Sequence, residues 1–433
     1  MNTAVRHAPD VVVGATSATD VHAAVRFAAA NGLPVGVISS GHGPSVRIDG
    51  GLLITTQRMT GVEIDPARRI TRVETGVRWR RVVDAAAEHG LAPLAGSAET
   101  VGVVGYMLGG GLSVTMGRAQ GWAADYVRAI EVVTPDGTLR RASADSEQDL
   151  FWALRGGKSN FGVVTALEFA LFPVTRLYAG VLFFDGEHMP AVLDAWRRLT
   201  ERAPDALTSS FALARMPAQA PVPAFMRGRL TVMVRISYLG DAAAGEQQIA
   251  SLRAAAPTLA DTVADRPYTE FDAIDPGPGG EPFSSVEQFM LLRELAPGTA
   301  EALVDAVGPD ADSDLLLVDI RQLGGALRQP QDGSSSAAGP IAEAGFMLFT
   351  LTPVPPGDGA QHLTAGLQLA ELLKPWLSER RHANFLAPSA AAPESTRAAF
   401  DDAAYARLRA IKAAVDPGNR FRFNYNIPPA DRA

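Results

Sequence analysis

Residues 37–45 read VISSGHGPS, in which a β-branched pair leads into a loop of two glycines and three serines. Glycine adopts positive φ readily, so Gly41 and Gly43 would let successive backbone N–H groups point at one anion. The segment therefore predicts a strand that ends in a phosphate-binding loop. On this segment alone, a tight turn with an exposed His42 is an equally good interpretation.

A second glycine-rich stretch, GSAETVGVVGYMLGGG, occupies residues 96–111. It has neither the Gly-Lys-Ser/Thr ending of a Walker loop nor the glycine spacing of the dinucleotide-binding fingerprint. Glycines this dense let a backbone approach a flat ligand closely, and the alternative is a flexible loop.

The first 175 or so residues around these stretches alternate apolar strands with amphipathic helices. Apolar residues at helical spacing predict a helix over 18–31, and Gly32 follows at the position where helices commonly end. Residues 135–137 predict a tight turn. The other expected elements are strands at 11–13, 35–38, 52–55, 70–74 and 130–133, and a helix at 81–89.

Beyond residue 175 the pattern changes to longer loops and strand-like runs. Runs at 230–238, 315–322 and 345–352, with a helix at 189–202, predict a second, largely antiparallel sheet. Loops are expected at 217–223 and 275–282, and residues 333–339 are expected to form a mobile Ser/Ala/Gly linker.

Composition excludes several classes of protein. The chain has 433 residues, which favours two domains, and no cysteine, which excludes disulfides, thiolate metal ligands, cysteine nucleophiles and thioether links. A net charge of −8 without a cluster of Lys and Arg argues against a nucleic-acid partner. The apolar runs are too short to cross a membrane, and the first ten residues are polar, so a cytoplasmic enzyme is expected.

Taken in order, these and further segments resemble the berberine-bridge-enzyme-like branch of the vanillyl-alcohol-oxidase flavoprotein family, whose FAD-binding domain is of the PCMH type. The family usually has one more unit of secondary structure before the point that matches Met1. The order and spacing of the segments carry the resemblance, which covers nearly the whole chain. The segments are residues 20–21, 40–42, 100–102, 108–111, 125, 149–157, 160–165, 411–412, 416–424 and 426–429.

The resemblance implies an α+β fold in three parts. Residues 1–175 would form the FAD-binding domain, and residues 176–385 a substrate-binding domain of antiparallel sheet covered by helices. Residues 386–433 would form a berberine-bridge-type segment that returns to complete the FAD domain.

The resemblance also implies a covalent cofactor. His42 matches the residue that carries an 8α-histidyl bond to FAD, and the bond would raise the potential of the flavin. The second anchor of the family, a cysteine, is Ala98 here. At most one covalent bond is therefore expected.

The resemblance assigns cofactor contacts to both glycine-rich stretches, to the strand that follows Asn160 and to the carboxyl end. The expected cofactor-binding residues are Ser39, Ser40, Gly41, His42, Gly43, Pro44, Ser45, Gly96, Ser97, Thr100, Val101, Gly102, Gly105, Tyr106, Gly109, Gly110, Asp125, Asn160, Gly162, Val163, Val164, Asn424 and Asn426.

Val101 stands where the family places a gate for oxygen beside the flavin. Valine at this point resembles the members that admit oxygen, whereas a larger side chain resembles the dehydrogenases. The alternative interpretation is an ordinary core valine.

Two departures from the family affect the expected chemistry. The tyrosine that follows the triple glycine in alcohol oxidases is Leu112, and their Tyr-x-Asn-Tyr base motif is replaced by HANF at 382–385. A general base must ionise within reach of the proton, so abstraction of an alcohol proton by a tyrosinate is not expected.

Tyr425 is the remaining candidate for a catalytic phenol. Alternation over residues 421–427 predicts a strand that places Phe421, Phe423 and Tyr425 on one face and Asn424 and Asn426 on the other. A tyrosine packed between strands is at least as good an interpretation. Weaker catalytic candidates are His382, Asp319, Arg321 and Gln322.

The leading functional hypothesis is an oxidase that passes hydride from a small or medium-sized organic metabolite to FAD and then to O2. Without an obvious base, the substrate would be one that gives up hydride unaided, such as an amine or an electron-rich reduced ring. The alternative is a cyclase or lyase that keeps FAD mainly as a scaffold. A flavin-free binding protein with the same fold is a third possibility, and the sequence does not indicate the oligomeric state.

Overall fold

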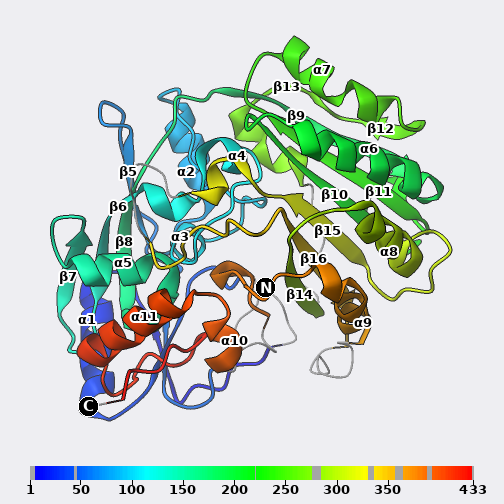
Figure 1. Cartoon of the computed structure of the whole chain (residues 1–433). Helices are drawn as coiled ribbons and strands as arrows, with labels where there is room; N and C mark the ends of the chain where they lie inside the picture. The colour runs from blue at the N-terminus through cyan, green and yellow to red at the C-terminus, as the bar shows by residue number, and fades with distance from the viewer. Residues whose placement is uncertain are drawn as a thin grey trace.

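The computed structural model describes residues 5–42, 46–219, 221–275, 284–329, 336–355, 364–387 and 393–431. It has two halves, one built from the chain ends and one from the middle of the chain (Figure 1). The first half begins with a parallel sheet of three strands in the order β1-β3-β2. Ser17 and Asp20 form a capping box that fixes the start of the helix between β1 and β2. These elements are β1 (Val11–Gly14), α1 (Ala18–Ala30), β2 (Val35–Ile38) and β3 (Leu52–Thr55).

A second sheet of the first half has five antiparallel strands in the order β4-β5-β8-β6-β7. Its core contains the fully buried rings of Trp79, Phe161 and Phe169. Its strands are β4 (Val62–Asp65), β5 (Ile70–Glu74), β6 (Val127–Val133), β7 (Leu139–Ser143) and β8 (Val163–Ala170). The helices around it are α2 (Trp79–Ala87), α3 (Val103–Met107), α4 (Gly117–Gln120), α5 (Gln148–Gly157), and the 3-10 turns η1 (Ala123–Tyr126) and η2 (Lys158–Phe161).

The carboxyl end returns to this half. Helix α11 (Asp402–Val415), red in Figure 1, lies beside α5, and its Leu408 is fully buried in the same core as Trp152. The short α10 (Pro393–Arg397) precedes α11.

The second half is a large antiparallel sheet in the order β12-β9-β11-β10-β15-β16-β14, with β13 also paired to β9. Helices α6 to α9 lie on one side of it (Figure 1), and Val318 and Ile320 of β15 join the core beneath them. Successive residues of a strand point to opposite faces, so Asp319 and Arg321 point to the other face. The strands are β9 (Arg176–Asp185), β10 (Leu207–Arg215), β11 (Leu230–Tyr238), β12 (Thr258–Asp261), β13 (Ala264–Pro267), β14 (Ser285–Leu292), β15 (Leu317–Gln322) and β16 (Phe346–Pro353). The helices are α6 (Met189–Arg202), α7 (Ala242–Arg253), α8 (Pro297–Val307) and α9 (Thr364–Leu373), with 3-10 turns η3 (Gly186–His188), η4 (Ala224–Met226), η5 (Tyr268–Ile274), η6 (Gly325–Arg328), η9 (Lys374–Trp376) and η10 (Ala383–Phe385).

Buried hydrogen bonds join the two halves. The Arg118 guanidinium donates to the Leu207 carbonyl at 2.7 Å, and the Ser237 hydroxyl donates to the Thr115 carbonyl at 3.0 Å. The segment 112–118 is therefore held against the inner face of the large sheet.

The α+β class predicted from the sequence is confirmed. Two local predictions are wrong. Residues 421–427 form bends and irregular backbone instead of a strand, because Phe421 packs into the core of the parallel sheet while Tyr425 packs into the neighbouring core. Part of the expected linker, residues 333–335, lies outside the described residues, but Ala337 and Ala338 are buried, and their N–H groups donate to the carbonyls of Trp152 and Arg155.

Among the described ranges, no helix combines the length and the apolar character that a bilayer crossing requires.

Candidate active site

The loop after β2 contacts the second glycine-rich stretch. The Ser40 hydroxyl accepts hydrogen bonds from the Gly102 N–H at 3.1 Å and from the His42 N–H at 3.4 Å. A Cβ atom on Gly102 would lie 2.9 Å from Ser40 Oγ, so only glycine permits this approach without displacement of the serine. The structure thus brings together residues of the two stretches that are 62 positions apart in the sequence.

The described part of this loop has the positive φ that the sequence predicts at Gly41. Gly41 has a φ of 65°, and the Ser39 hydroxyl donates to the Thr75 carbonyl at 2.7 Å. Gly43, Pro44 and Ser45 lie outside the described residues.

His42 stands at the rim of this loop. The residue is exposed to solvent, yet the protein around the imidazole lowers its pKa by desolvation, and the positive charge of Arg78 lowers the pKa further. The imidazole is therefore neutral at neutral pH, the form that has a nucleophilic nitrogen.

The second glycine-rich stretch has one open position. A Cβ atom on Gly96 would lie 3.0 Å from the Tyr106 ring, whereas a Cβ atom on Gly105 would meet no atom within 4 Å. Gly105 and Thr100 are exposed and Ser97 is half-buried. The surface beside Gly105 is therefore free to receive a ligand.

Tyr106 has a structural role in this stretch. Its hydroxyl donates to the Leu94 carbonyl at 3.0 Å, and its ring meets Trp79 edge-on at 5.2 Å. Burial raises the pKa of the phenol well above its ordinary value. The phenol consequently has no tendency to ionise at physiological pH.

Gly109 and Gly110 lie directly against residues 382–384 from the end of the large domain. A Cβ atom on Gly109 would lie 1.8 Å from Asn384 Oδ1, and one on Gly110, whose φ is 113°, would lie 2.8 Å from His382 Nε2. The Asn384 amide donates to the Tyr106 carbonyl at 2.7 Å. A side chain at Gly109 or at Gly110 would therefore disturb the contact between this stretch and residues 382–384.

His382 is buried with one nitrogen unsatisfied. Its ring stacks on Trp122 at 4.5 Å, and Nδ1 accepts from the Asn384 N–H at 3.2 Å. Within the described residues Nε2 has no hydrogen-bond partner. Burial, together with the charges of Lys158 and Arg380, lowers the pKa of His382 to about 3. The imidazole is thus a neutral hydrogen-bonding group.

Leu112 and Phe385, the residues that replace the two phenols, share one apolar cluster. Leu112 is buried with Trp122 and Leu327, and Phe385 packs against them. This part of the site has no ionisable oxygen from either position.

Four other expected cofactor-binding residues have packing roles. Asn160 donates from Nδ2 to the Tyr425 carbonyl at 3.1 Å, and its Oδ1 accepts from the Ile427 N–H at 2.9 Å. A Cβ atom on Gly162 would lie 2.5 Å from the Val133 carbonyl oxygen. Val163 and Val164 of β8 are buried in the two cores of the first half.

Asp125 lies where the segment that contains the buried Ala337 and Ala338 meets the first half. It is 8% exposed, and Oδ1 accepts a long hydrogen bond from the Ser336 hydroxyl at 3.5 Å.

Tyr425 is buried, and its hydroxyl donates to the Leu386 carbonyl. Burial, and secondarily the charge of Glu287, raises the pKa of its phenol. The neighbouring Asn424 and Asn426 each have a buried Oδ1 atom without a hydrogen-bond partner among the described residues. The asparagines therefore offer free acceptors, whereas the tyrosine hydroxyl is already engaged.

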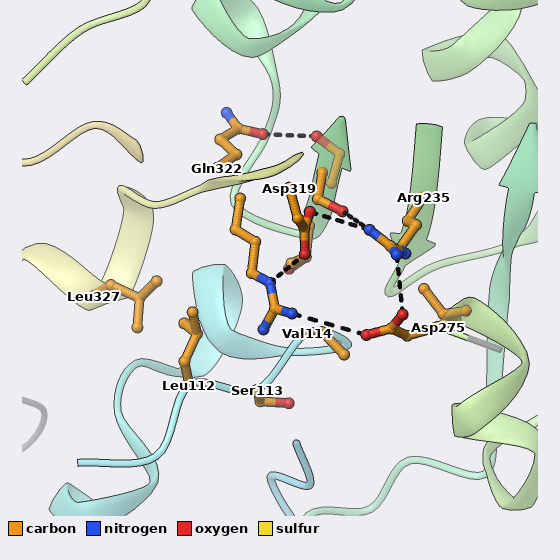
Figure 2. Close-up of a pocket in the computed structure, with 13 residues that line it drawn as sticks. Leu112, Ser113, Val114, Arg235, Asp275, Asp319, Gln322 and Leu327 are labelled. Atoms are coloured by element: carbon orange, nitrogen blue, oxygen red, sulfur yellow. Dashed lines mark hydrogen bonds and ion pairs between the residues drawn. The ribbon is translucent and has the colours of Figure 1, made fainter. Parts of the chain in front are cut away.

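A pocket lies between the inner face of the large sheet and residues 112–114 (Figure 2). One wall is a chain of paired charges. Arg235 lies 3.0 Å from both Asp319 and Asp275, and Arg321 donates from Nε to Asp319 at 2.8 Å. Apolar side chains of Leu112, Val114 and Leu327 line the other side (Figure 2).

The charges of this pocket are fixed by one another. Burial opposes ionisation of Asp319, but Arg235 and Arg321 outweigh it and hold the pKa of Asp319 below its ordinary value. Asp319 is therefore a paired carboxylate and no free base. Gln322 contributes to packing, because its amide contacts the Ser209 hydroxyl at 3.0 Å and the Thr200 carbonyl at 3.1 Å.

Sequence reasoning missed Arg235, Asp275 and Lys158. Arg235 interrupts the apolar run of a predicted strand, which was an available signal for a functional side chain. Asp275 lies in a loop and had no such signal. Lys158 follows a glycine pair and is one of three lysines in the chain, which was also a usable signal.

The residues fit the FAD that the sequence predicts. Gly41 has the positive φ that a diphosphate-binding loop uses, the surface beside Gly105 is open, and His382, Asn424 and Asn426 have buried polar atoms with unmet hydrogen bonds. Among the described residues, no group of acidic or histidine side chains could hold a metal ion.

Comparison with known families gives two matches. Residues 9–143 match the model of the FAD binding domain, and residues 383–428 match the model described as berberine and berberine like. The two matches flank the large sheet domain.

The chain is also similar over nearly its full length to individual proteins. It is 29% identical to (R)-6-hydroxynicotine oxidase of Paenarthrobacter nicotinovorans over 97% of this chain and 91% of that protein. The crystal structure of 6-hydroxy-D-nicotine oxidase from Arthrobacter nicotinovorans superposes with a TM-score of 0.80 at 25% identity, covering 99% of this chain and 94% of that one.

A xylooligosaccharide oxidase from Myceliophthora thermophila has the same fold, with a TM-score of 0.83 at 21% identity over 100% of this chain and 94% of the other. The fold, the two family matches and the full-length similarity agree: the chain is an FAD-linked oxidoreductase with the berberine-bridge-enzyme-like fold.

Proposed function

We propose that this protein is an oxidase of a small amine, with FAD bound covalently through His42 and O2 as the electron acceptor. Bound FAD supplies the two-electron acceptor for a hydride from the carbon next to the amine nitrogen. The full-length similarity to a 6-hydroxynicotine oxidase supports a nitrogen-containing substrate.

The replacement of both phenols is the observation that carries this proposal. Leu112 and Phe385 are apolar, and the neutral His382 ring packs against Phe385 at 5.2 Å. An alcohol needs a base to take its proton as hydride leaves, whereas the lone pair of a neutral amine assists the departure of hydride without one. The site therefore suits an amine better than a sugar.

The pocket in Figure 2 would receive the substrate. Its apolar wall would exclude water from the body of the molecule, and the Arg235–Asp319–Arg321–Asp275 wall would hydrogen-bond to a polar substituent. His382 Nε2, which carries the imidazole proton because Nδ1 accepts from the Asn384 N–H, would donate a hydrogen bond and orient the bound molecule.

The test is anaerobic mixing of the purified protein with a panel of secondary and tertiary cyclic amines, benzylic alcohols and oligosaccharides. We expect the flavin absorbance to bleach with an amine and to recover when air is admitted, with release of hydrogen peroxide. Bleaching by alcohols or sugars alone would contradict the amine proposal. Product formation without bleaching would favour the alternative in which FAD is a scaffold for a cyclase or lyase.

Val101→Ile is expected to slow reoxidation of the reduced enzyme at least tenfold. Two hydrogen bonds fix the backbone of Val101: its N–H donates to the Ala98 carbonyl at 3.2 Å, and its carbonyl accepts from the Trp79 N–H at 3.1 Å. The backbone therefore cannot move away, and the added methylene of isoleucine must extend into the space that the valine side chain borders. A tenfold change corresponds to about 1.4 kcal/mol of barrier. Stopped-flow mixing of photoreduced enzyme with oxygen measures the rate, with exposed Val12→Ile as the control. Equal rates for Val101→Ile and wild type would remove the gate assignment.

A further inference from the structure

Lys158 has a backbone conformation that lysine rarely adopts. It begins η2 directly after α5, with φ of 53° and ψ of −138°. This combination lies outside the left-handed helical region and is normally restricted to glycine. A non-glycine residue kept in such a conformation points to a function for its side chain.

The side chain enters the site described above. Its Cε atom lies beside Gly109, since a Cβ atom added to that glycine would be 2.6 Å from it. Its Nζ lies 6.0 Å from the centre of the Tyr425 ring. Its charge also contributes to the low pKa of His382. Lys158 thus meets the second glycine-rich stretch, residues 382–384 and the carboxyl end at one point.

No counter-charge for the ammonium group occurs in the part of the chain that the structure describes. Within the described residues, it makes no ion pair and no hydrogen bond; its neighbours are a glycine, an amide, a neutral imidazole and a phenol ring. Burial lowers the pKa of Lys158 to about 8, although part of the residue stays accessible, so the group is still charged at neutral pH. An unpaired charge in such surroundings is unfavourable unless a ligand supplies its partner.

We propose that the Lys158 ammonium lies beside the isoalloxazine ring of bound FAD and stabilises the negative charge that the ring acquires on reduction. When a C–H bond of the substrate breaks, the hydride carries two electrons and one proton to the flavin N5, and the ring is left with one negative charge while the substrate carbon becomes a cation. This assignment rests on FAD as the cofactor and not on the identity of the substrate.

Two other anions are less compatible with the position of Lys158. The loop at 39–42, which is suited to a diphosphate, makes its hydrogen bonds to Thr75 and to Gly102, which precedes α3, whereas Gly109 follows α3. The pocket in Figure 2, which is suited to the substrate, is lined by thirteen residues that do not include Lys158.

The experiment is a reductive titration of the FAD-loaded protein against a reference dye, which gives the potential without any substrate. The variants are Lys158→Met, which removes the charge, Lys158→Arg, which keeps it, and Lys158→Gly, which removes the charge and also the backbone strain. The control is Lys374→Met, because Lys374 is exposed and paired with Glu371 at 3.0 Å.

We expect Lys158→Met and Lys158→Gly to lower the ratio of reduced to oxidised FAD at a fixed potential at least tenfold, which is about 30 mV for a two-electron couple. Lys158→Arg should stay within threefold of wild type, and Lys374→Met should be unchanged. Lys158→Gly should also melt at a higher temperature than Lys158→Met, because glycine adopts the required φ without strain.

An unchanged potential in Lys158→Met that retains FAD would overturn the proposal. So would a loss of FAD from Lys158→Met and Lys158→Gly but not from Lys158→Arg, since that result would place the charge on the diphosphate. A failure of the amine panel to bleach the wild-type flavin, with the potential shift present, would contradict only the substrate class.

Discussion

His42→Ala is expected to release all of the flavin when the protein is precipitated with acid, whereas the wild-type precipitate should stay yellow. The chain has no cysteine, so no second side chain of the family type can hold the cofactor once the imidazole is gone. The lowered pKa of His42 keeps the imidazole neutral, and only the neutral form can attack the 8α carbon of the flavin. His42→Ala should therefore release the flavin completely and not only in part.

The fluorescence of flavin in the protein band of a denaturing gel measures this result, and a peptide map locates the modified residue. His89→Ala is a matched control, because His89 is an exposed histidine just after α2. If the flavin stayed with acid-precipitated protein while His42 was unmodified, the covalent assignment would be wrong. The assignment of FAD to this half of the molecule would survive that result.

Local sequence patterns predicted the first half well. The strands at 35–38, 52–55 and 70–74 appear as predicted, because short apolar runs bounded by turn residues have few alternatives to a buried strand. Helix α6 also appears at its predicted bounds, and its Pro190 lies in the first turn, where the missing N–H costs nothing. The formation of these strands and of α6 is determined mainly by residues that are adjacent in the sequence.

The carboxyl end shows where such patterns fail. The alternation of aromatic residues over 421–427 arises because the chain passes between two cores, and Phe421 and Tyr425 enter different ones. No strand among the described residues pairs with this segment, so its periodicity has a different cause from the pleat of a sheet. Only the tertiary structure distinguishes a β-strand from a segment whose aromatic residues enter two different cores.

The candidate site depends even more on tertiary contacts. The glycines at 109 and 110 were expected to approach a ligand, and the structure places them against His382 and Asn384, more than 270 residues away in the sequence. The Arg235–Asp319 pair joins strands that are separated by the intervening β10, and neither partner identifies the other in the sequence. Pairing of charges across a sheet is a property of register, which the sequence did not specify.

A buried ion pair explains the motif at the carboxyl end. Lys412 is fully buried near the end of α11, and its ammonium donates to Asp416 Oδ2 at 2.8 Å and to the Asn160 carbonyl at 2.6 Å. Asp416, which is 1% exposed, accepts from the N–H groups of Arg420 and Phe421, each at 2.9 Å. One lysine and one aspartate thus hold α11, η2 and the returning segment together.

Lys412→Met is expected to destabilise the protein by about 3–5 kcal/mol, because it leaves the Asp416 carboxylate buried without a counter-charge. Methionine has a similar length, so a cavity adds little to the effect. Urea unfolding followed by tryptophan fluorescence measures the change, and Lys374→Met, which removes an exposed ion pair, is expected to stay within about 0.5 kcal/mol of wild type. Since Trp152 packs in the core that contains Leu408 of α11, the Lys412→Met transition should move to lower urea concentration for the FAD half. Coincident unfolding curves for the two lysine variants would show that the pair contributes no more to stability than a surface contact.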